Sequence, residues 1–301
     1  MTRIFQYSTD SDSDFSGRTV GEFLRSKGYT SRIISSLKRM ETGIQVNSKK
    51  AFTNYLLQEN DLLSITLEET LTTEKILPTE LPFHIIYEDD DILVADKDDN
   101  TPVHPSIGNY DNTLANAAAW YFTQKGLTIP FRCINRLDRD TTGLLILAKH
   151  RLSGAILSED MKKRRIQRTY LALVSGNFTE TEGLVDAPLL RDPNSLMKRC
   201  VNPQGERALT HYKLLENLHN AALLQLHLET GRTHQIRVHM AHIGHPLPGD
   251  FLYNPEDHRC PRQMLHSSHL SFRHPITGEV MTFDAAMPAD MQEAVYRLKK
   301  L

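Results

Sequence analysis

The sequence lacks the long apolar runs and the paired cysteines that mark membrane proteins and disulfide-rich proteins. None of its apolar runs approaches the ~20 residues that a helix needs to cross a bilayer, and residues 1–15 carry no apolar core of the signal-peptide type. Its three cysteines, Cys133, Cys200 and Cys260, are odd in number and have no CxxC spacing, which argues against a disulfide framework. We therefore expect a cytoplasmic protein with no membrane partner.

The common cofactor motifs are missing as well. No Gly-rich loop of the dinucleotide or P-loop form follows a predicted strand, so a nucleotide cofactor is not indicated. Histidines at positions 234, 239, 242 and 245 could meet on a helix, but neither an HExxH pattern nor a pair of cysteines accompanies them. We predict no cofactor and no metal, and a metal-dependent hydrolase built on these histidines is the less favoured alternative.

Charge is spread unevenly along a chain whose total is close to neutral. The 301 residues carry a net charge of −2, with acids concentrated at 8–14 and 88–99 and bases at 18–50, 162–168 and 232–239. A near-neutral total can conceal local basic surfaces that bind nucleic acid. The 40% hydrophobic fraction is ordinary for a globular protein and is sufficient for a large core.

The sequence divides into four segments of different character. Residues 1–15 are polar, and we predict a flexible lead-in. Helical apolar spacing followed by short alternating strands predicts a small αβ domain at 16–70. Residues 71–82 contain threonines and two prolines, which is typical of an interdomain linker. In 83–301 strands dominate and helices do not alternate with them strictly, so we predict an α+β domain with a mixed, largely antiparallel sheet and flanking helices.

The segment 135–143 places several charged side chains directly before an apolar run at 144–148. Active sites favour such edges, where a loop lies on a rigid strand. Taken alone, Asp138 could be a structural ion-pair residue, Tyr170 a core tyrosine and Arg237 the partner of a nearby carboxylate. The functional interpretation depends on these three residues acting together.

Four motifs occur in order along the larger domain. They read NRLDRDTTGLLILAK at 135–149, RTYLALVSG at 168–176, TGRTHQIRVHMAHIGHP at 230–246 and LHSSHLSFRHPITGE at 265–279. In these motifs the chain resembles the RluA/RluD family of RNA pseudouridine synthases, over residues 82–290. The resemblance implies a pseudouridine synthase fold and an isomerase that needs no cofactor.

The resemblance also implies roles for individual residues. Asp138 corresponds to the catalytic carboxylate, Arg237 to its basic partner and Tyr170 to the tyrosine that packs on the target base. A neighbouring cation favours the ionised form of a carboxylate and fixes its orientation. Residues that we predict to contact RNA in this domain are Arg136, Lys163, Arg165, Arg232 and His234.

The amino-terminal domain resembles the small S-four-like RNA-binding module of ribosomal proteins over residues 16–68. Such a module presents helix-borne cations to RNA phosphates, which provide affinity and orientation rather than sequence choice. The corresponding cations here are Arg25, Arg32, Lys38 and Arg39. A solvated basic face with no RNA partner is the alternative for this run.

The predicted partner is structured RNA, bound by a monomer. Large-subunit ribosomal RNA is the favoured substrate because of the amino-terminal domain, and tRNA is the second choice. A non-catalytic RNA-binding or ribosome-assembly protein is an alternative from another class. The chain departs from the family pattern at 98–100, where a Pro and a Gly are common, at Asn135 and at Pro248, and these departures bear on the RNA chosen rather than on the reaction.

Overall fold

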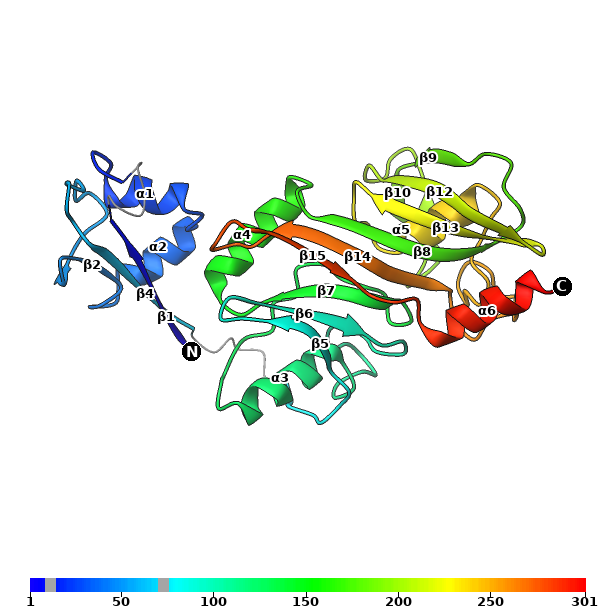
Figure 1. Cartoon of the computed structure of the whole chain (residues 1–301), viewed down its shortest axis with the longest axis horizontal. Coiled ribbons are helices and arrows are strands. Elements are labelled where there is room, and N and C mark those ends of the chain that lie inside the picture. Colours follow the sequence, from blue (N-terminus) through cyan, green and yellow to red (C-terminus); the bar gives the residue numbers. More distant parts are fainter. Residues whose placement is uncertain (9–14, 70–75) are drawn as a thin grey trace.

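The computed structural model describes residues 1–8, 15–69 and 76–301. A small amino-terminal unit lies at one end of a larger unit that is built around a long sheet (Figure 1). The elements of the small unit are β1 (Thr2–Tyr7), α1 (Val20–Ser26), α2 (Ser31–Leu37), β2 (Ile44–Val46), β3 (Lys49–Lys50) and β4 (Leu63–Glu68).

The larger unit contains the remaining elements. They are β5 (His84–Glu88), β6 (Ile92–Lys97), α3 (Leu114–Gln124), β7 (Thr142–Ala148), α4 (Arg151–Lys162), β8 (Gln167–Ser175), β9 (Glu182–Asp186), β10 (Leu189–Arg191), β11 (Arg199–Val201), β12 (Leu209–Leu218), β13 (Ala221–Leu228), α5 (Gln235–His242), β14 (Leu265–Arg273), β15 (Val280–Asp284) and α6 (Ala289–Lys299).

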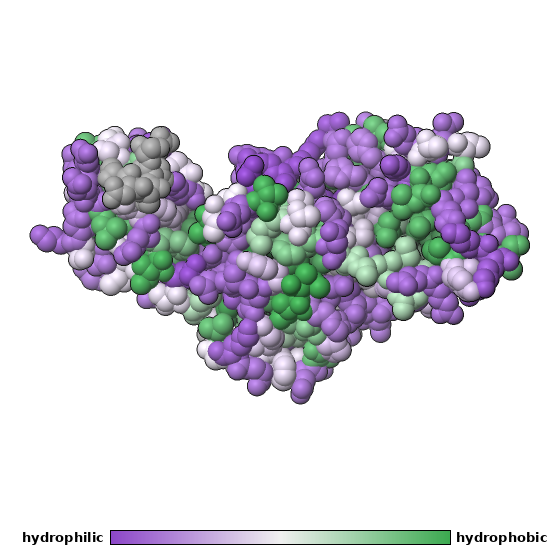
Figure 2. Space-filling model, in the orientation of Figure 1, coloured by the Kyte–Doolittle hydropathy of each residue, from purple (hydrophilic) through white to green (hydrophobic). Residues whose placement is uncertain are grey.

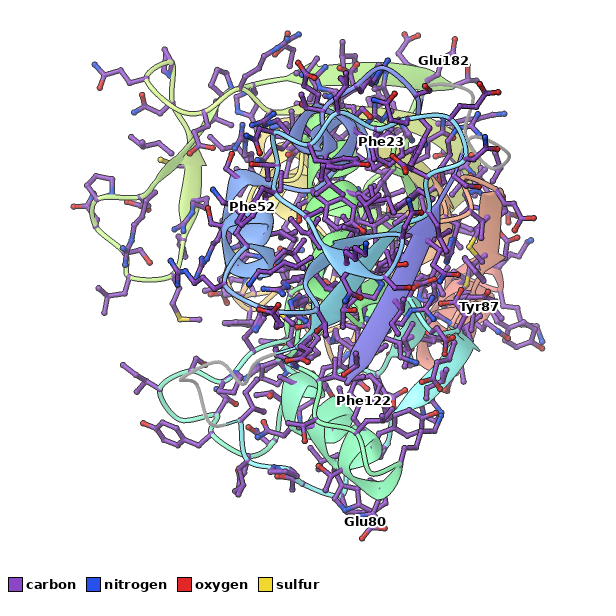
Figure 3. All side chains as sticks on the ribbon, turned by 90° about the vertical axis from the view of Figure 1, so that its left-hand side faces the viewer. Phe23, Phe52, Glu80, Tyr87, Phe122 and Glu182 are labelled. Carbon is purple, nitrogen blue, oxygen red and sulfur yellow. The ribbon has the colours of Figure 1, made fainter. Side chains whose placement is uncertain are left out.

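The amino-terminal unit is a four-stranded sheet in the order β1-β4-β2-β3 with two short helices. Both helices begin at a threonine cap, because the Thr19 and Thr30 side chains accept hydrogen bonds from the first turn. Aromatic and aliphatic side chains from both helices and from the sheet fill its core, in which Phe23 is fully buried, whereas Phe52 lies at the surface (Figure 3).

The prediction of a flexible lead-in at 1–15 is wrong for its first part. Residues 2–7 form β1, which pairs antiparallel with β4 along its whole length. Phe5 and Tyr7 are two residues apart and so lie on one face of the strand, where Phe5 is buried in the core and Tyr7 packs against it. Residues 9–14 of the predicted lead-in and 70–75 of the predicted linker region lie outside the described residues.

The larger unit has a nine-stranded sheet in the order β5-β6-β7-β14-β8-β13-β12-β9, with β15 paired to β14. Only β7 and β14 pair in parallel; the other pairs within this sheet are antiparallel. The predicted mixed, largely antiparallel sheet is therefore confirmed. Gly143 has a φ of +108°, and a Cβ there would overlap the Ser267 carbonyl, so only glycine allows β14 to approach β7 at this point.

The two faces of this sheet carry different cores. β7 is buried along its whole length, as expected for a central strand with apolar residues on both sides. Along β8 the side chains alternate, so that Tyr170 and Ala172 enter a core covered by α3 and α5, while Leu171 and Leu173 face a core covered by α6. Tyr170 consequently lies on the face that carries the pocket described below.

The amino-terminal unit packs against α4 of the larger unit (Figure 1). Leu152 of α4 belongs to the amino-terminal core, and Arg3 of β1 bonds to Asp91 in the turn between β5 and β6. The surface seen in Figure 2 is largely hydrophilic, with apolar patches scattered over both units. Among the helices of the described ranges, none combines the length and the apolar character that crossing a membrane requires.

Candidate active site

A cavity of about 840 Å³ opens beside the amino-terminal end of β7. Its lining comes mainly from the loop before β7, the first residues of β8 and the turn that leads into α5. All three predicted catalytic residues, Asp138, Tyr170 and Arg237, line this cavity. Asp138 and Arg237, which are 99 positions apart in the sequence, are thus brought together in one cavity.

Asp138 and Arg237 form an ion pair inside the cavity. Arg237 Nη1 donates to Asp138 Oδ2 at 2.9 Å, and the Asp138 side chain is 25% exposed while that of Arg237 is 2% exposed. The carboxylate is therefore accessible to a ligand on one side and fixed on the other. This geometry agrees with the predicted partnership of the two residues.

Asp250, which was not predicted, holds the other edge of the guanidinium. Its fully buried carboxylate accepts two hydrogen bonds from Arg237, at Nε and Nη2, both of 2.7 Å. Asp250 Oδ1 also accepts from the backbone N–H groups of Leu252 and Tyr253, which fixes the carboxylate in turn. Burial would lower the pKa of Arg237, but the hydrogen bonds to Asp250 and the Asp138 charge outweigh it, so its pKa is raised.

Two aromatic rings and an imidazole complete the surroundings of this ion pair. Phe251 and Tyr253 lie 5.7 and 5.2 Å from the Arg237 guanidinium carbon. The Tyr253 hydroxyl lies 2.9 Å from His234 Nδ1. Burial lowers the pKa of His234 despite the opposing charge of Asp138, so the imidazole is neutral at neutral pH. As a neutral group it leaves Arg237 as the cation that pairs with Asp138.

Hydrogen bonds from Lys97 and Asn135 hold the loop that carries Asp138. Lys97 is almost completely buried, and its Nζ donates to the carbonyls of Asp98, Thr101 and Arg139 at 2.7, 2.9 and 2.8 Å. The Asn135 amide bridges to β7 by hydrogen bonds with the backbone of Leu144 and Ile146. These bonds hold the backbone on both sides of Asp138.

Burial lowers the pKa of Lys97 to about 7, although the carboxylates of Asp140 and Asp138 oppose the shift. Lys97 directly precedes residues 98–100, where the chain departs from the family pattern, and its three carbonyl contacts hold this altered loop to the end of β6.

Comparison with known proteins agrees with this site. A family model described as RNA pseudouridylate synthase matches residues 91–242, and the chain is 39% identical to the uncharacterized RNA pseudouridine synthase YjbO of Bacillus subtilis over 92% of this chain and 98% of that protein. The chain belongs to the RNA pseudouridine synthase family. As a pseudouridine synthase it is an isomerase, as the sequence motifs implied.

Other similar proteins support the same family. The synthase is 42% identical to the ribosomal large subunit pseudouridine synthase D of Haemophilus ducreyi, over 77% of this chain and 75% of that protein. Among solved structures it is similar to human RNA pseudouridylate synthase domain containing 1, with a TM-score of 0.58 and 26% sequence identity, over 72% of this chain and 86% of that chain. The pseudouridine synthase fold is thereby confirmed.

The residues predicted to contact RNA take different places in the synthase. Arg136, Arg232 and His234 line the cavity, with Arg232 paired to Glu206. Lys163 and Arg165 follow the end of α4 and pair with acids of that helix, whereas their neighbours Lys162 and Arg164 reach the cavity wall. The amino-terminal cations Arg25, Arg32, Lys38 and Arg39 are exposed on the small unit.

Three of the four histidines considered for a metal site have protein partners in separate places, namely His234, His239 and His245. His239 bonds through both ring nitrogens, to Thr210 and to the Ala187 carbonyl, and His245 bonds to the Ser175 carbonyl. His234 bonds to Tyr253, as described above. This arrangement does not favour the metal-dependent hydrolase alternative.

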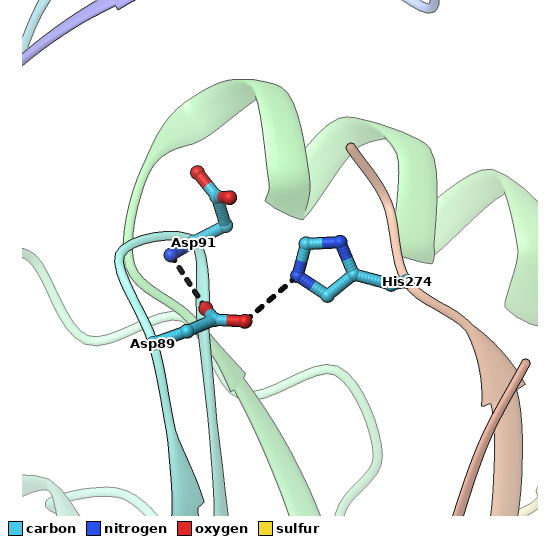
Figure 4. Close-up of side chains that lie close together, drawn as sticks. All are labelled: Asp89, Asp91 and His274. Carbon is cyan, nitrogen blue, oxygen red and sulfur yellow. Dashed lines mark hydrogen bonds and ion pairs between the residues drawn. The ribbon is translucent and has the colours of Figure 1, made fainter. Parts of the chain in front are cut away.

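The structure also brings together two aspartates and a histidine that were not considered as metal ligands from the sequence. Asp89, Asp91 and His274 could hold an ion by their spacing (Figure 4). Asp89 Oδ1 accepts the backbone N–H of Asp91, and Asp89 Oδ2 lies 2.9 Å from His274 Nε2. Asp91 Oδ1 accepts two hydrogen bonds from Arg3. Because its oxygens are engaged in this way, the group joins the β5–β6 turn to the amino-terminal unit.

Proposed function

We propose that this synthase isomerises uridines of large-subunit ribosomal RNA, with Asp138 as its catalytic carboxylate. The observation that carries the proposal is the accessible Asp138 side chain, fixed by Arg237 in the cavity that Tyr170 also lines. The choice of RNA is supported by the 42% identity to a protein named ribosomal large subunit pseudouridine synthase D. tRNA is the second candidate substrate.

The reaction breaks the bond between uracil N1 and ribose C1′ and rejoins the base through its C5. The proton on C5 is lost and N1 gains one, so atoms and charge balance without an oxidant or an energy source. The step needs a group that acts on the ribose or the base as a nucleophile or as an electrostatic partner, and a group that assists removal of the C5 proton. Asp138 takes the first role.

Tyr170 supplies a surface for the detached uracil. Tyr170 lies on β8 and lines the same cavity as Asp138. A ring that stacks on the base keeps it from escaping while it turns, and in this proposal the hydroxyl assists removal of the C5 proton. Arg237 remains paired with Asp138 and holds the carboxylate in its orientation.

The synthase must bind the RNA on both sides of the extruded uridine. Extrusion of a base from a stack costs a few kcal/mol, less in a loop, and contacts to the surrounding phosphates offset that cost. In this proposal Arg136 and Arg232 grip the RNA at the cavity mouth, Lys163 and Arg165 lie next to it, and the exposed cations of the amino-terminal unit provide a second hold.

The test is pseudouridine mapping of cellular RNA with and without this chain. We expect one or more pseudouridines of large-subunit ribosomal RNA to disappear without it and to return with the wild-type chain. Loss of sites only in tRNA would overturn the choice of RNA. RNA binding with no pseudouridine formed would favour a non-catalytic RNA-binding or ribosome-assembly protein.

The role of Asp138 is tested by Asp138→Asn in the same assay. We expect this variant to fold and to bind RNA but to form no pseudouridine, because the amide keeps the shape of the side chain and removes its charge. Asp284→Asn is the matched control, since Asp284 is 76% exposed on β15 and pairs only with His269 in the described structure. Activity retained by Asp138→Asn would contradict the assignment.

A further inference from the structure

Arg168 is a buried cation in the wall of the cavity, and no described residue pairs with it. It lies on β8 two residues before Tyr170 and is 7% exposed. Within the described part of the chain, its side chain makes no hydrogen bond or ion pair, and its Nε is buried without an acceptor. Burial of an unpaired charge is costly, so such a group calls for an explanation.

The neighbouring cations differ from Arg168 in this respect. Arg237 is held by two carboxylates, and Arg232 and Arg164 pair with Glu206 and Glu229. Glu229 is the second carboxylate that lines the cavity besides Asp138, and it is engaged by Arg164 and His211. No carboxylate of the cavity wall is therefore left to neutralise Arg168.

Gly231 makes room for this guanidinium. Gly231 does not need glycine for its backbone, because its φ is not in the left-handed region. A Cβ at this position would lie 2.9 Å from Arg168 Nη1 and 3.5 Å from Nη2. The absence of a side chain at Gly231 therefore provides the space in which the guanidinium of Arg168 is seated.

We propose that Arg168 binds a phosphodiester group of the RNA next to the base that packs on Tyr170. The inference rests on the proposed function of this cavity and adds the group that recognises the backbone inside it. A guanidinium offers a planar set of donors that matches two phosphate oxygens. Arg168 and Tyr170 are two residues apart on one strand, so they lie on the same face about 7 Å apart, within the span of one nucleotide.

The test compares Arg168→Gln and Arg168→Lys with the wild-type chain in pseudouridine formation at several salt concentrations. The substrate is RNA from cells that lack this chain, in whichever species the wild-type chain modifies. We expect Arg168→Gln to lower kcat/KM at least tenfold at low salt. It should also reduce the slope of log kcat/KM against log salt by nearly one, because one phosphate contact is lost. Arg168→Lys should keep the slope.

Two further variants separate phosphate binding from a structural role. Arg273→Gln is the control, since Arg273 is exposed at the end of β14 and lies outside the cavity wall, and it should leave the slope unchanged. Gly231→Ala keeps the charge of Arg168 but displaces its guanidinium. Its effect on kcat/KM should largely disappear when it is combined with Arg168→Gln, since both changes remove the same contact.

The proposal is overturned if Arg168→Gln folds and keeps the wild-type salt slope. It is also overturned if the effects of Gly231→Ala and Arg168→Gln simply add. If Arg168→Gln does not fold, the proposal is judged from the other two variants in the same assay. Arg168→Lys must then keep the salt slope of the wild-type chain, and Gly231→Ala must reduce it. If the choice of large-subunit ribosomal RNA is wrong, the wild-type chain will modify another RNA. The variants are then compared on that RNA, so this outcome is distinguishable from failure of the Arg168 proposal.

Discussion

Replacing Asp250 by asparagine should lower the catalytic activity, although Asp250 itself does not line the cavity. Asp250 is fully buried and holds Arg237 by two hydrogen bonds of 2.7 Å. In Asp250→Asn one oxygen can still accept from the backbone N–H groups of residues 252 and 253. The amide N–H₂ then faces the guanidinium, so a donor opposes a donor and Arg237 must move.

The size of the effect follows from the burial of this pair. Removing one partner of a buried ion pair costs about 3–5 kcal/mol, because the other charge is left uncompensated. Arg237 keeps its bond to the partly exposed Asp138, so we expect the lower end of that range for the free energy of unfolding. A displacement of about 1 Å at the reacting centre can cost ~100-fold in rate, and we expect a loss of kcat of that order.

Urea unfolding and pseudouridine formation measure the two effects separately. Trp120, the single tryptophan of the chain, lies on α3 of the larger unit, so its fluorescence reports on the unfolding of that unit. Asp284→Asn is again the control and should leave both quantities unchanged. If Asp250→Asn is less stable but keeps kcat within twofold of the wild-type value, Asp250 does not position Arg237 for catalysis.

Two other changes test the support of the site and of the fold. Lys97→Met removes three hydrogen bonds to the backbone of the loop after β6 and of Arg139. We expect the free energy of unfolding to fall by about 2 kcal/mol and kcat to fall more than tenfold. An unchanged kcat would show that these hydrogen bonds are not needed to position Asp138. Burial would raise the pKa of Glu88, but hydrogen bonds from Lys125, Lys149 and Tyr121 outweigh it and lower the pKa to about 2. The folded pKa is thus below the unfolded one, and the stabilisation is present above pH ~4.3 and lost as the pH falls toward 2. Glu88→Gln should cost about 1 kcal/mol at pH 7, after allowance for solvent screening, and its urea midpoint should approach that of the wild-type chain at pH 3; an equal difference at both pH values would contradict this account.

Much of the fold follows from local sequence patterns. The basic two-helix segment, the strands that follow it and the mixed sheet of the larger unit are all present. β1 was missed because a six-residue strand at the start of a polar segment has little to distinguish it except Phe5 and Tyr7. Its pairing with β4 joins residues more than 50 positions apart, and local patterns do not show such a contact.

The candidate site was predicted only in part, because some of its contacts join segments that local sequence patterns do not connect. The motifs identified Asp138, Tyr170 and Arg237, and the structure brings them to one cavity. Asp250 was missed because it follows a Pro-Gly turn of ordinary composition. Its role appears only when the turn after α5 folds back on Arg237, which is a tertiary contact. A search for a carboxylate that could satisfy the second edge of a buried arginine would have suggested it.

The charges around the cavity explain why these residues must be considered together. Asp138 and Asp250 share the single charge of Arg237, and burial lowers the pKa of His234, which makes it neutral. This cluster alone carries a net negative charge, which would repel an RNA backbone. Arg168 adds a positive charge to the cavity wall, and since no described residue pairs with it, our proposal assigns this charge to an RNA phosphate. If both proposals hold, Asp138 acts on the ribose or the base while Arg168 binds the phosphate in the same cavity.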